Sequence, residues 1–254
     1  MSALLSVRDL GMRFGGLLAV DGVSFDVGSG QVVSIIGPNG AGKTTVFNCI
    51  SGFYRPTSGQ VTLLGKTISR LPGHKVARHG LVRTFQNVRL FRTMTVVENL
   101  LVAQHTRVDT NLLTGMLKTR AYRAKEEAAM ERAGVWLDLV GLREVANREA
   151  GNLAYGQQRR LEIARCMVTG PKLVMLDEPA AGLNPNETKE LDELILLLRA
   201  EHDVSVLLIE HDMKLVMEIS DHIVVIDQGR PLAEGTATEI RNNPDVIKAY
   251  LGES

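Results

Sequence analysis

A glycine-rich run that follows a short apolar segment constrains this 254-residue chain more than any other feature. The apolar segment, residues 32–36, has the pattern of a buried strand. The run after it fits G-x-x-x-x-G-K-[ST], the pattern of a backbone loop that cradles phosphates. Residues 45–50 then carry apolar side chains at helical spacing, so strand, loop and helix come in the order that a phosphate site requires. The run consists of Gly37, Pro38, Asn39, Gly40, Ala41, Gly42, Lys43, Thr44 and Thr45.

The residue types in this run suit the chemistry of a nucleotide site. Glycine allows positive φ, so the backbone N–H groups can turn inward around the β-phosphate. Lys43 supplies a positive charge and Thr44 a hydroxyl for Mg²⁺, while the N-terminus of the following helix favours anions. We therefore expect a nucleotide and Mg²⁺ to bind here. This motif alone leaves open a GTPase, a small-molecule kinase, a helicase-like motor or a transport ATPase.

A second motif, about 130 residues later, narrows the reaction. Residues 173–176 are apolar, and the two acids Asp177 and Glu178 follow them directly. Such a pattern is typical of a buried parallel strand that ends at the edge of an active site. We expect Asp177 to hold the metal shell and Glu178 to orient or deprotonate the attacking water. Two adjacent carboxylates at this place favour metal-assisted hydrolysis over phosphoryl transfer to a substrate.

The segment between these two motifs resembles the ATP-binding cassette (ABC) family. The signature of that family is Leu-Ser-Gly-Gly-Gln at the start of a helix, and residues 153–157 match three of its five positions. Gln86 resembles the glutamine of the family's Q-loop, residues 181–185 its D-loop, and His211 its switch histidine. The resemblance spans nearly all of the chain. No guanine-reading Asn-Lys-x-Asp run is present in the sequence, which argues against a GTPase.

The resemblance implies an α/β fold and a set of site residues. The fold is that of a P-loop NTPase, with a RecA-like parallel-sheet core, an antiparallel β-subdomain and a helical subdomain that carries the signature. The ligands are ATP and Mg²⁺. Phe14 stands where the family places an aromatic side chain that stacks on adenine, although a core aromatic is a rival interpretation. The further assignments are Glu178, His211 and Gln86 for catalysis, and Thr44, Gln86 and Asp177 for the metal.

The signature segment departs from the family pattern in an informative way. In the family, two cassettes meet head to tail, and each ATP lies between one subunit's phosphate loop and the other's signature, here Ala154, Tyr155, Gly156 and Gln157. Ala154 replaces a serine whose hydroxyl would bond the γ-phosphate, a bond worth roughly 1.5–3 kcal/mol. Tyr155 replaces a glycine, and Asn184 replaces the usual aspartate of the D-loop. Because Lys43 and the hydrolytic residues are intact, we expect a second, non-identical cassette to be the partner.

Composition and charge exclude several other classes of protein. The chain is 44% hydrophobic and 23% charged, as expected of a globular protein. Its 29 basic and 29 acidic residues balance, so no nucleic-acid partner is expected. Cys49 and Cys166 both fall in predicted helices without C-x-x-C spacing, which indicates buried thiols in a reducing compartment. No apolar stretch approaches the roughly 20 residues that span a bilayer, and no signal pattern is present.

The pattern along the chain predicts a single ABC domain over residues 1–254, built from two parts. Strands are expected at residues 4–10, 23–27 and 59–63, and again at 173–176, 204–209 and 222–226, with a helix at 186–200. A helical character sets in from residue 107 to 141, with the clearest helix at 121–136. We expect the catalytic core with its β-subdomain at about 1–86 and 166–254, and the helical subdomain at about 87–165. Long coiled coils and tandem cassettes, which would have indicated other ABC ATPases, are absent from the sequence.

Residues 153–167, 180–185 and 243–252 resemble the ATP-binding subunits of bacterial branched-chain amino acid importers. The resemblance implies pairing with a second cassette, two integral membrane permeases and, indirectly, a periplasmic binding protein, at the cytoplasmic face of the inner membrane. Leu90, Phe91, Met94 and Val97 offer a surface on which a permease helix can dock, although packing within the core is the alternative. Urea, amide or polar amino acid cargoes stay open, as does a soluble regulatory ATPase without a membrane partner.

Overall fold

The computed structural model describes residues 3–104 and 120–251, and the chain divides into two compact units. The first unit comprises Met1–Arg83, Pro171–Ala181 and Thr188–Ser254, and the second comprises Thr84–Gly170 and Gly182–Glu187. The exact limits of the helical subdomain, expected at residues 87–165, stay a prediction. Part of the helical character expected from residue 107 onward falls on residues 105–119, outside the described residues.

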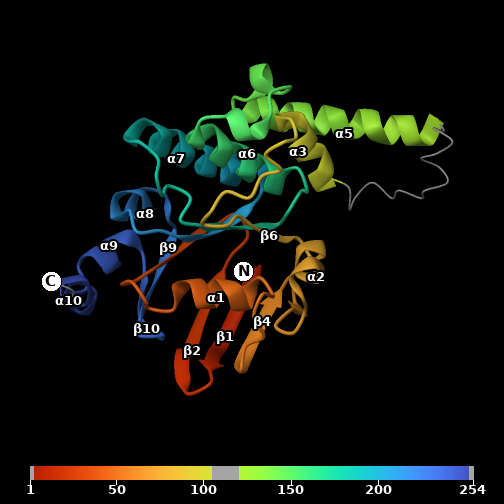
Figure 1. Cartoon of the computed structure of the whole chain (residues 1–254). Helices are drawn as coiled ribbons and strands as arrows, with labels where there is room; N and C mark the ends of the chain where they lie inside the picture. The colour runs from red at the N-terminus through yellow and green to blue at the C-terminus, as the bar shows by residue number, and fades with distance from the viewer. Residues whose placement is uncertain (1–2, 105–119, 252–254) are drawn as a thin grey trace. The chain divides into compact units, whose positions relative to one another are not determined.

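An antiparallel sheet forms one layer of the first unit. Its strand order is β2-β1-β4-β5, and β1, β2 and β4 run side by side in Figure 1. The strands span Leu5–Phe14 (β1), Leu17–Val27 (β2), Ser58–Leu63 (β4) and Lys66–Thr67 (β5). β1 and β2 are longer than predicted because the register shifts between Val7 and Leu10 and again around Met12, which interrupts the alternation of polar and apolar residues. Phe14 is consequently the last residue of a strand.

The second sheet of this unit carries the two chemical motifs. Its order is β10-β9-β3-β8-β7-β6, and all neighbouring pairs are parallel except β9 with β10. The strands span Val32–Ile36 (β3), Leu81–Arg83 (β6), Leu173–Asp177 (β7), Ser205–Ile209 (β8), His222–Asp227 (β9) and Arg230–Gly235 (β10). Every residue of β3, β7 and β8 is buried, which explains why these strands are mostly apolar. The parallel core beside an antiparallel sheet confirms the predicted fold class.

One hydrophobic core joins both sheets of the first unit and fixes the helix that follows the phosphate loop. That helix, α1 (Lys43–Ile50), buries Val46, Phe47 and Ile50 in a cluster that also contains residues of β1, β2, β3, β7 and β8. Burial of each such side chain contributes about 1.5–3 kcal/mol, so the start of α1 is held rigidly. The other helices of this unit are α2 (Gly73–Arg78), α8 (Met213–Ile219), α9 (Ala237–Arg241), α10 (Pro244–Leu251) and most of α7 (Pro185–His202).

The second unit is helical in its described part. It contains α3 (Val96–Ala103), the long α5 (Arg120–Leu139) and α6 (Tyr155–Met167), with short 3₁₀ turns at Arg143–Val145 and Ala150–Asn152. Helical spacing places Met130, Ala133 and Leu137 of α5 near one face, but Ala133 and Leu137 are buried whereas Met130 is 50% exposed. The buried stripe of α5 is therefore narrower than its sequence pattern. Among the described residues, no helix has the length and apolarity to cross a bilayer.

Candidate nucleotide-binding and hydrolysis site

The phosphate loop owes its shape to close backbone contacts at two glycines. Gly37 and Gly42 have φ values of 150° and 96°. A Cβ at Gly37 would overlap the carbonyl oxygen of Ile226, and one at Gly42 would lie 2.7 Å from the carbonyl oxygen of Ala19. Any larger residue at either position would displace the backbone of a neighbouring strand. Glycine is therefore required at both positions, for space as well as for conformation.

The amine of Lys43 lies inside this loop. It is 5% exposed, and its Nζ donates hydrogen bonds to the carbonyl oxygens of Gly37 at 2.6 Å and Pro38 at 2.7 Å. A buried ammonium needs such acceptors, because its desolvation would otherwise be costly. The lysine is thus held with its charge directed along the loop.

A cavity of about 210 Å³ opens on this loop and brings the two motifs together. Residues 39–45 line it, and so do Glu178 and His211. Thr44 and Thr45 belong to the lining. Asp177 and Phe14 are not among the lining residues. The first unit therefore places the glycine-rich loop, an acid and a histidine around one cavity.

Glu178 and His211 contact one another directly. His211 Nε2 lies 2.7 Å from Glu178 Oε1, so the imidazole donates to the carboxylate when that nitrogen carries its proton. Glu178 has φ 46°, in the left-handed region, and its backbone N–H donates to the carbonyl of Ile209 at 2.9 Å. A non-glycine residue held in this region is costly unless its surroundings fix it, and such positions cluster at active sites.

Asp177 ends β7 and is paired with an arginine that the sequence did not single out. The Arg83 guanidinium donates to Asp177 Oδ2 at 2.5 Å, and both side chains are almost fully buried. The same guanidinium donates to Asn48 Oδ1 at 2.7 Å and to Ser51 Oγ at 3.1 Å, both on α1 or its C-cap. Arg83 therefore ties the acidic strand to the helix behind the phosphate loop. A charged residue within the short apolar segment before Gln86 was the signal available in the sequence.

The donors in this unit fit Mg²⁺ bound together with phosphates. Thr44 offers a hydroxyl and Asp177 a carboxylate, which are the hard oxygen ligands that Mg²⁺ prefers. Within residues 3–104 and 120–251, no group of three or more His, Cys, Asp or Glu side chains forms a metal cluster. Mg²⁺ commonly takes only one or two protein ligands and completes its shell with water and phosphate. The residues present therefore suit a nucleotide-borne metal.

The aromatic ring of Phe14 is available for a ligand. Phe14 is 41% exposed and meets Tyr54 edge to face, with ring centroids 5.3 Å apart. This exposure argues against the core interpretation. Tyr54, which follows α1, was not expected beside it.

Gln86 belongs to the second unit, where an arginine of α6 holds its backbone. Arg159 donates to the carbonyl oxygens of Phe85 at 2.8 Å and Gln86 at 2.9 Å, and it pairs with Glu162 at 3.0 Å. Arg159 and Glu162 are fully buried, and burial raises the pKa of the Glu162 carboxyl. The side chain of Gln86 is exposed. Within this unit the predicted Q-loop is therefore joined to the signature helix by hydrogen bonds from Arg159, whose guanidinium is held by its buried ion pair with Glu162.

The signature segment begins α6 and packs against the predicted D-loop of the same unit. Ala154 is the N-cap and offers no side-chain acceptor, while its N–H donates to Gln157 Oε1 at 3.3 Å. Gly156 is buried, and a Cβ there would overlap the carboxylate of Glu187. The space that a side chain at Gly156 would occupy is therefore filled by the side chain of Glu187. Tyr155 lies against Gly182, where a Cβ would come within 3.2 Å of its ring.

Asn184, the other departure from the family pattern, has a local structural role. Its Oδ1 accepts hydrogen bonds from the N–H groups of Asn186 and Glu187, both at 3.0 Å, at the start of α7. An amide oxygen caps a helix about as well as a carboxylate does. The substitution for aspartate therefore removes a charge without removing the cap.

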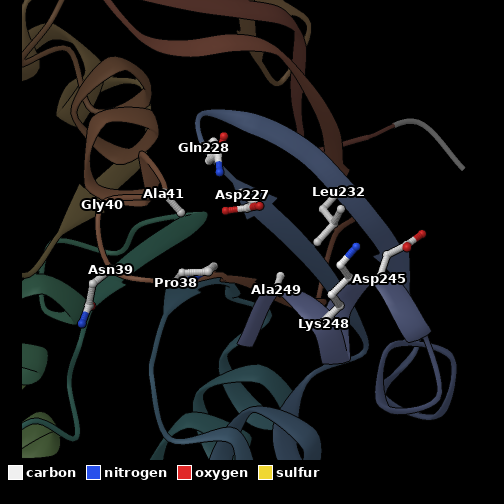
Figure 2. A pocket seen from close by; sticks show the side chains of 10 residues that line it. All are labelled: Pro38, Asn39, Gly40, Ala41, Asp227, Gln228, Leu232, Asp245, Lys248 and Ala249. Atoms are coloured by element: carbon white, nitrogen blue, oxygen red, sulfur yellow. The ribbon is translucent and has the colours of Figure 1, made fainter. Parts of the chain in front are cut away.

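A larger cavity, of about 570 Å³, lies on another side of the phosphate loop. Pro38–Ala41 of the loop line it together with residues of β9, β10 and α10. Figure 2 shows Asp227 at the end of β9 between the loop and the α10 residues Asp245 and Lys248. The C-terminal elements β10 and α10, which we did not assign from the pattern, thus flank the phosphate loop.

Comparison with known proteins identifies the family. The model described as ABC transporter matches residues 20–181, and the model described as Branched-chain amino acid ATP-binding cassette transporter matches residues 230–254. The second match covers β10 and α10, which flank the larger cavity.

Curated relatives match over almost their whole length. The chain is 68% identical over 251 residues to the high-affinity branched-chain amino acid transport ATP-binding protein BraF of Pseudomonas aeruginosa. It is 64% identical over 251 residues to LivG of Escherichia coli, a protein of the same description. Both matches cover 99% of this chain and 98% of the relative.

Solved structures agree. The ADP conformation of MJ1267, an ATP-binding cassette of an ABC transporter, has a TM-score of 0.86 at 34% identity, with 99% of this chain and 100% of that chain covered. A nucleotide-free ATP-binding cassette from an ABC transporter has a TM-score of 0.85 at 35% identity, with 98% and 99% covered. The chain therefore belongs to the ABC transporter family of ATP-binding cassettes and, within it, to the group of branched-chain amino acid transport ATP-binding proteins.

Proposed function

We propose that this chain is the ATP-hydrolysing subunit of a bacterial ABC importer and energises the uptake of leucine, isoleucine and valine through partner permeases. The observation that carries the chemistry is the phosphate-loop cavity with the Glu178–His211 pair on its wall. The cargo rests on the 68% and 64% identity to branched-chain amino acid transport proteins, because no residue of a cassette needs to touch the cargo.

ATP binds with its phosphates on the loop and its adenine against Phe14. The triphosphate replaces the carbonyl acceptors of Lys43, so its Nζ exchanges the oxygens of Gly37 and Pro38 for phosphate oxygens. The backbone N–H groups of residues 39–45 supply the remaining donors. Thr44, Asp177 and Gln86 would hold Mg²⁺, which would supply positive charge to the phosphates.

Glu178 orients the attacking water and accepts its proton. His211 holds the Glu178 carboxylate through the 2.7 Å contact, which keeps the base in one position relative to the loop. Placement of this kind is the main contribution that a protein makes to phosphoryl transfer.

A second, non-identical cassette completes the nucleotide site. Ala154, Tyr155, Gly156 and Gln157 cap the ATP of that partner, and the partner's signature caps the ATP of this chain. Ala154 has no hydroxyl to donate to the γ-phosphate of the partner's ATP, whereas a complete signature from the partner would still cap the ATP of this chain.

The chain works on the cytoplasmic face of the inner membrane through two integral permeases, which receive cargo from a periplasmic binding protein. Phe91 is 47% exposed and Met94 37% exposed, and Leu90 and Val97 are partly exposed, which suits a docking surface better than a core. The chain carries no net charge, so it offers no broad attraction to nucleic acid.

Uptake by the assembled transporter in lipid vesicles tests the proposal. ATP enclosed with the cassettes should drive accumulation of labelled leucine, isoleucine and valine when the binding protein is supplied on the opposite side. Glu178→Gln should leave ATP binding intact and lower turnover by about 10²–10⁴, the range for loss of a general base. Glu201→Gln, at an exposed residue of α7, is the matched control and should behave as wild type.

Two outcomes would contradict the proposal. Accumulation of urea, an amide or a polar amino acid in place of leucine would overturn the cargo. Turnover that survives Glu178→Gln would overturn the assignment of the base.

A further inference from the structure

Glu210 directly follows β8, and its buried carboxylate accepts hydrogen bonds from backbone N–H groups. It is 4% exposed. Its Oε1 accepts a hydrogen bond from the N–H of Ala180 at 2.7 Å. Its Oε2 accepts from the N–H groups of His211 at 2.9 Å and Asp212 at 3.4 Å. One side chain therefore holds the backbone of two separate loops.

These two loops are the ones that carry the hydrolytic pair. β7 and β8 are neighbouring parallel strands, and Asp177 is paired in register with Ile209. Ala180 lies two residues after Glu178 in the loop that follows β7, and His211 follows Glu210 in the loop after β8. Beyond the strand ends the regular ladder stops, apart from the bond from Glu178 N–H to the Ile209 carbonyl at 2.9 Å. The carboxylate of Glu210 continues the connection between the loops where the sheet no longer does.

Charge and burial make this tie strong. Hydrogen bonds from backbone N–H groups to an ionised carboxylate are shorter and stronger than neutral ones, and a low-dielectric setting strengthens them further. Glu178 itself sits at φ 46°, a conformation that persists only where the surroundings hold it. Glu210 supplies part of that restraint from the adjacent strand.

We propose that Glu210 is a positioning residue for ATP hydrolysis, which sets the separation of Glu178 and His211 by tying the loops after β7 and β8 together. This inference rests on the proposed hydrolytic role of Glu178. Glu210 is not among the residues that line the phosphate-loop cavity, and it bonds to the backbone of the lining residue His211, so we expect it to act on turnover and not on ATP binding.

Glu210→Gln in the assembled transporter is the first test. The carboxamide keeps the size of the side chain. Its NH₂ group, however, cannot accept the hydrogen bond that a backbone N–H donates to the carboxylate oxygen at that place. A displacement of the order of 1 Å in an active site can cost about 10²-fold in rate, so we expect kcat to fall by roughly 10–10²-fold with the Kd for ATP unchanged. The turnover of Glu178→Gln gives the lowest kcat to be expected in this experiment, because it includes any hydrolysis that continues at the partner's site.

Two further variants separate positioning from charge and from general stability. Glu210→Asp keeps the negative charge but is one methylene shorter, so it loses the reach to Ala180 and should also lower kcat. Glu239→Gln is the control for loss of a carboxylate bond to backbone, because Glu239 accepts from the Thr236 N–H at 2.7 Å in an exposed capping box of α9. It should leave kcat at the wild-type value.

A double variant tests whether Glu210 acts through the base. In a Glu178→Gln background, Glu210→Gln should cause no further loss of turnover, since the group that it positions is already gone. A multiplicative loss, wild-type kcat in Glu210→Asp, or a raised Kd for ATP in Glu210→Gln would each overturn the proposal. If Glu210→Gln does not fold, judged by ATP binding and thermal midpoint, Glu210→Asp decides alone. Failure of the proposed function is distinct, because Glu178→Gln would then leave turnover unchanged.

Discussion

Removal of the buried arginine in the second unit should destabilise the protein more than any change at its surface. Arg159 is 0% exposed and pairs with Glu162, which is 1% exposed. Arg159→Met keeps the apolar stem but leaves the Glu162 carboxylate buried without its counter-charge. Breaking such a pair by removing one partner costs about 3–5 kcal/mol.

This cost converts into a measurable shift of the melting temperature. A change of 1 kcal/mol moves the midpoint by about 2–4 °C for a protein of this size, so Arg159→Met should melt about 6–20 °C lower. The backbone carbonyls of Phe85 and Gln86 also lose their donors, so Gln86 should become less well ordered. Differential scanning calorimetry of the purified subunit, with hydrogen exchange over residues 84–90, measures both effects.

The double variant Arg159→Met/Glu162→Leu provides the decisive comparison. Replacing both members of a buried pair by apolar groups of similar volume is often neutral or stabilising. Its melting temperature should therefore return most of the way to the wild-type value. It should stay somewhat lower because the Arg89 N–H, which donates to Glu162 Oε1 at 3.1 Å, loses its acceptor. A double variant that melts as low as the sum of the two single variants would refute the reasoning, as would a single variant that melts within 2 °C of wild type.

Three further predictions concern other parts of the chain. Ala154→Ser adds the missing N-cap acceptor and should stabilise α6 by about 1 kcal/mol, raising the melting temperature; no change would count against the observed cap. It should also raise turnover at the partner's site. Phe91→Asp should release the subunit from permease-containing membranes at unchanged ATP affinity, and full retention in a flotation assay would exclude this surface. Burial raises the pKa of Cys49 to about 11 and of Cys166 to about 12, so both thiols should stay protonated at pH 8; rapid labelling by a thiol reagent in the folded protein would contradict this.

A strand or helix could be predicted where the same short stretch of sequence both forms it and carries the candidate site residues. The run from Val32 to Ile50 gave strand, loop and helix in order, and the structure has β3, the loop and α1 there. The same holds for β7 with Asp177 and Glu178. Both motifs concentrate glycine, charge and apolar runs within a few residues, so the local pattern carries enough information.

The contacts that hold these motifs in place could not be predicted, because each joins residues far apart in the chain. Arg83 reaches Asp177 across 94 positions, and Glu210 reaches Ala180 across 30. Neither residue belongs to a periodic pattern, and an isolated charge beside a strand usually indicates a solvated end. Only parallel pairing of β6, β7 and β8 brings these side chains to one edge.

The departures from the family pattern in the signature segment lie in a different unit from the hydrolytic residues. Glu178, His211 and Lys43 lie together in the first unit and act on the ATP that this chain binds, under the proposed function. Ala154 and Tyr155 lie in the second unit and, under the proposed function, act on the ATP of the partner. In the proposed pair, a loss at Ala154 would cost this chain nothing in its own hydrolysis, because the signature that caps its ATP would come from the other subunit. Two identical copies would carry the defect at both sites, whereas a non-identical pair confines it to one, which is why the incomplete signature and a heterodimer belong together.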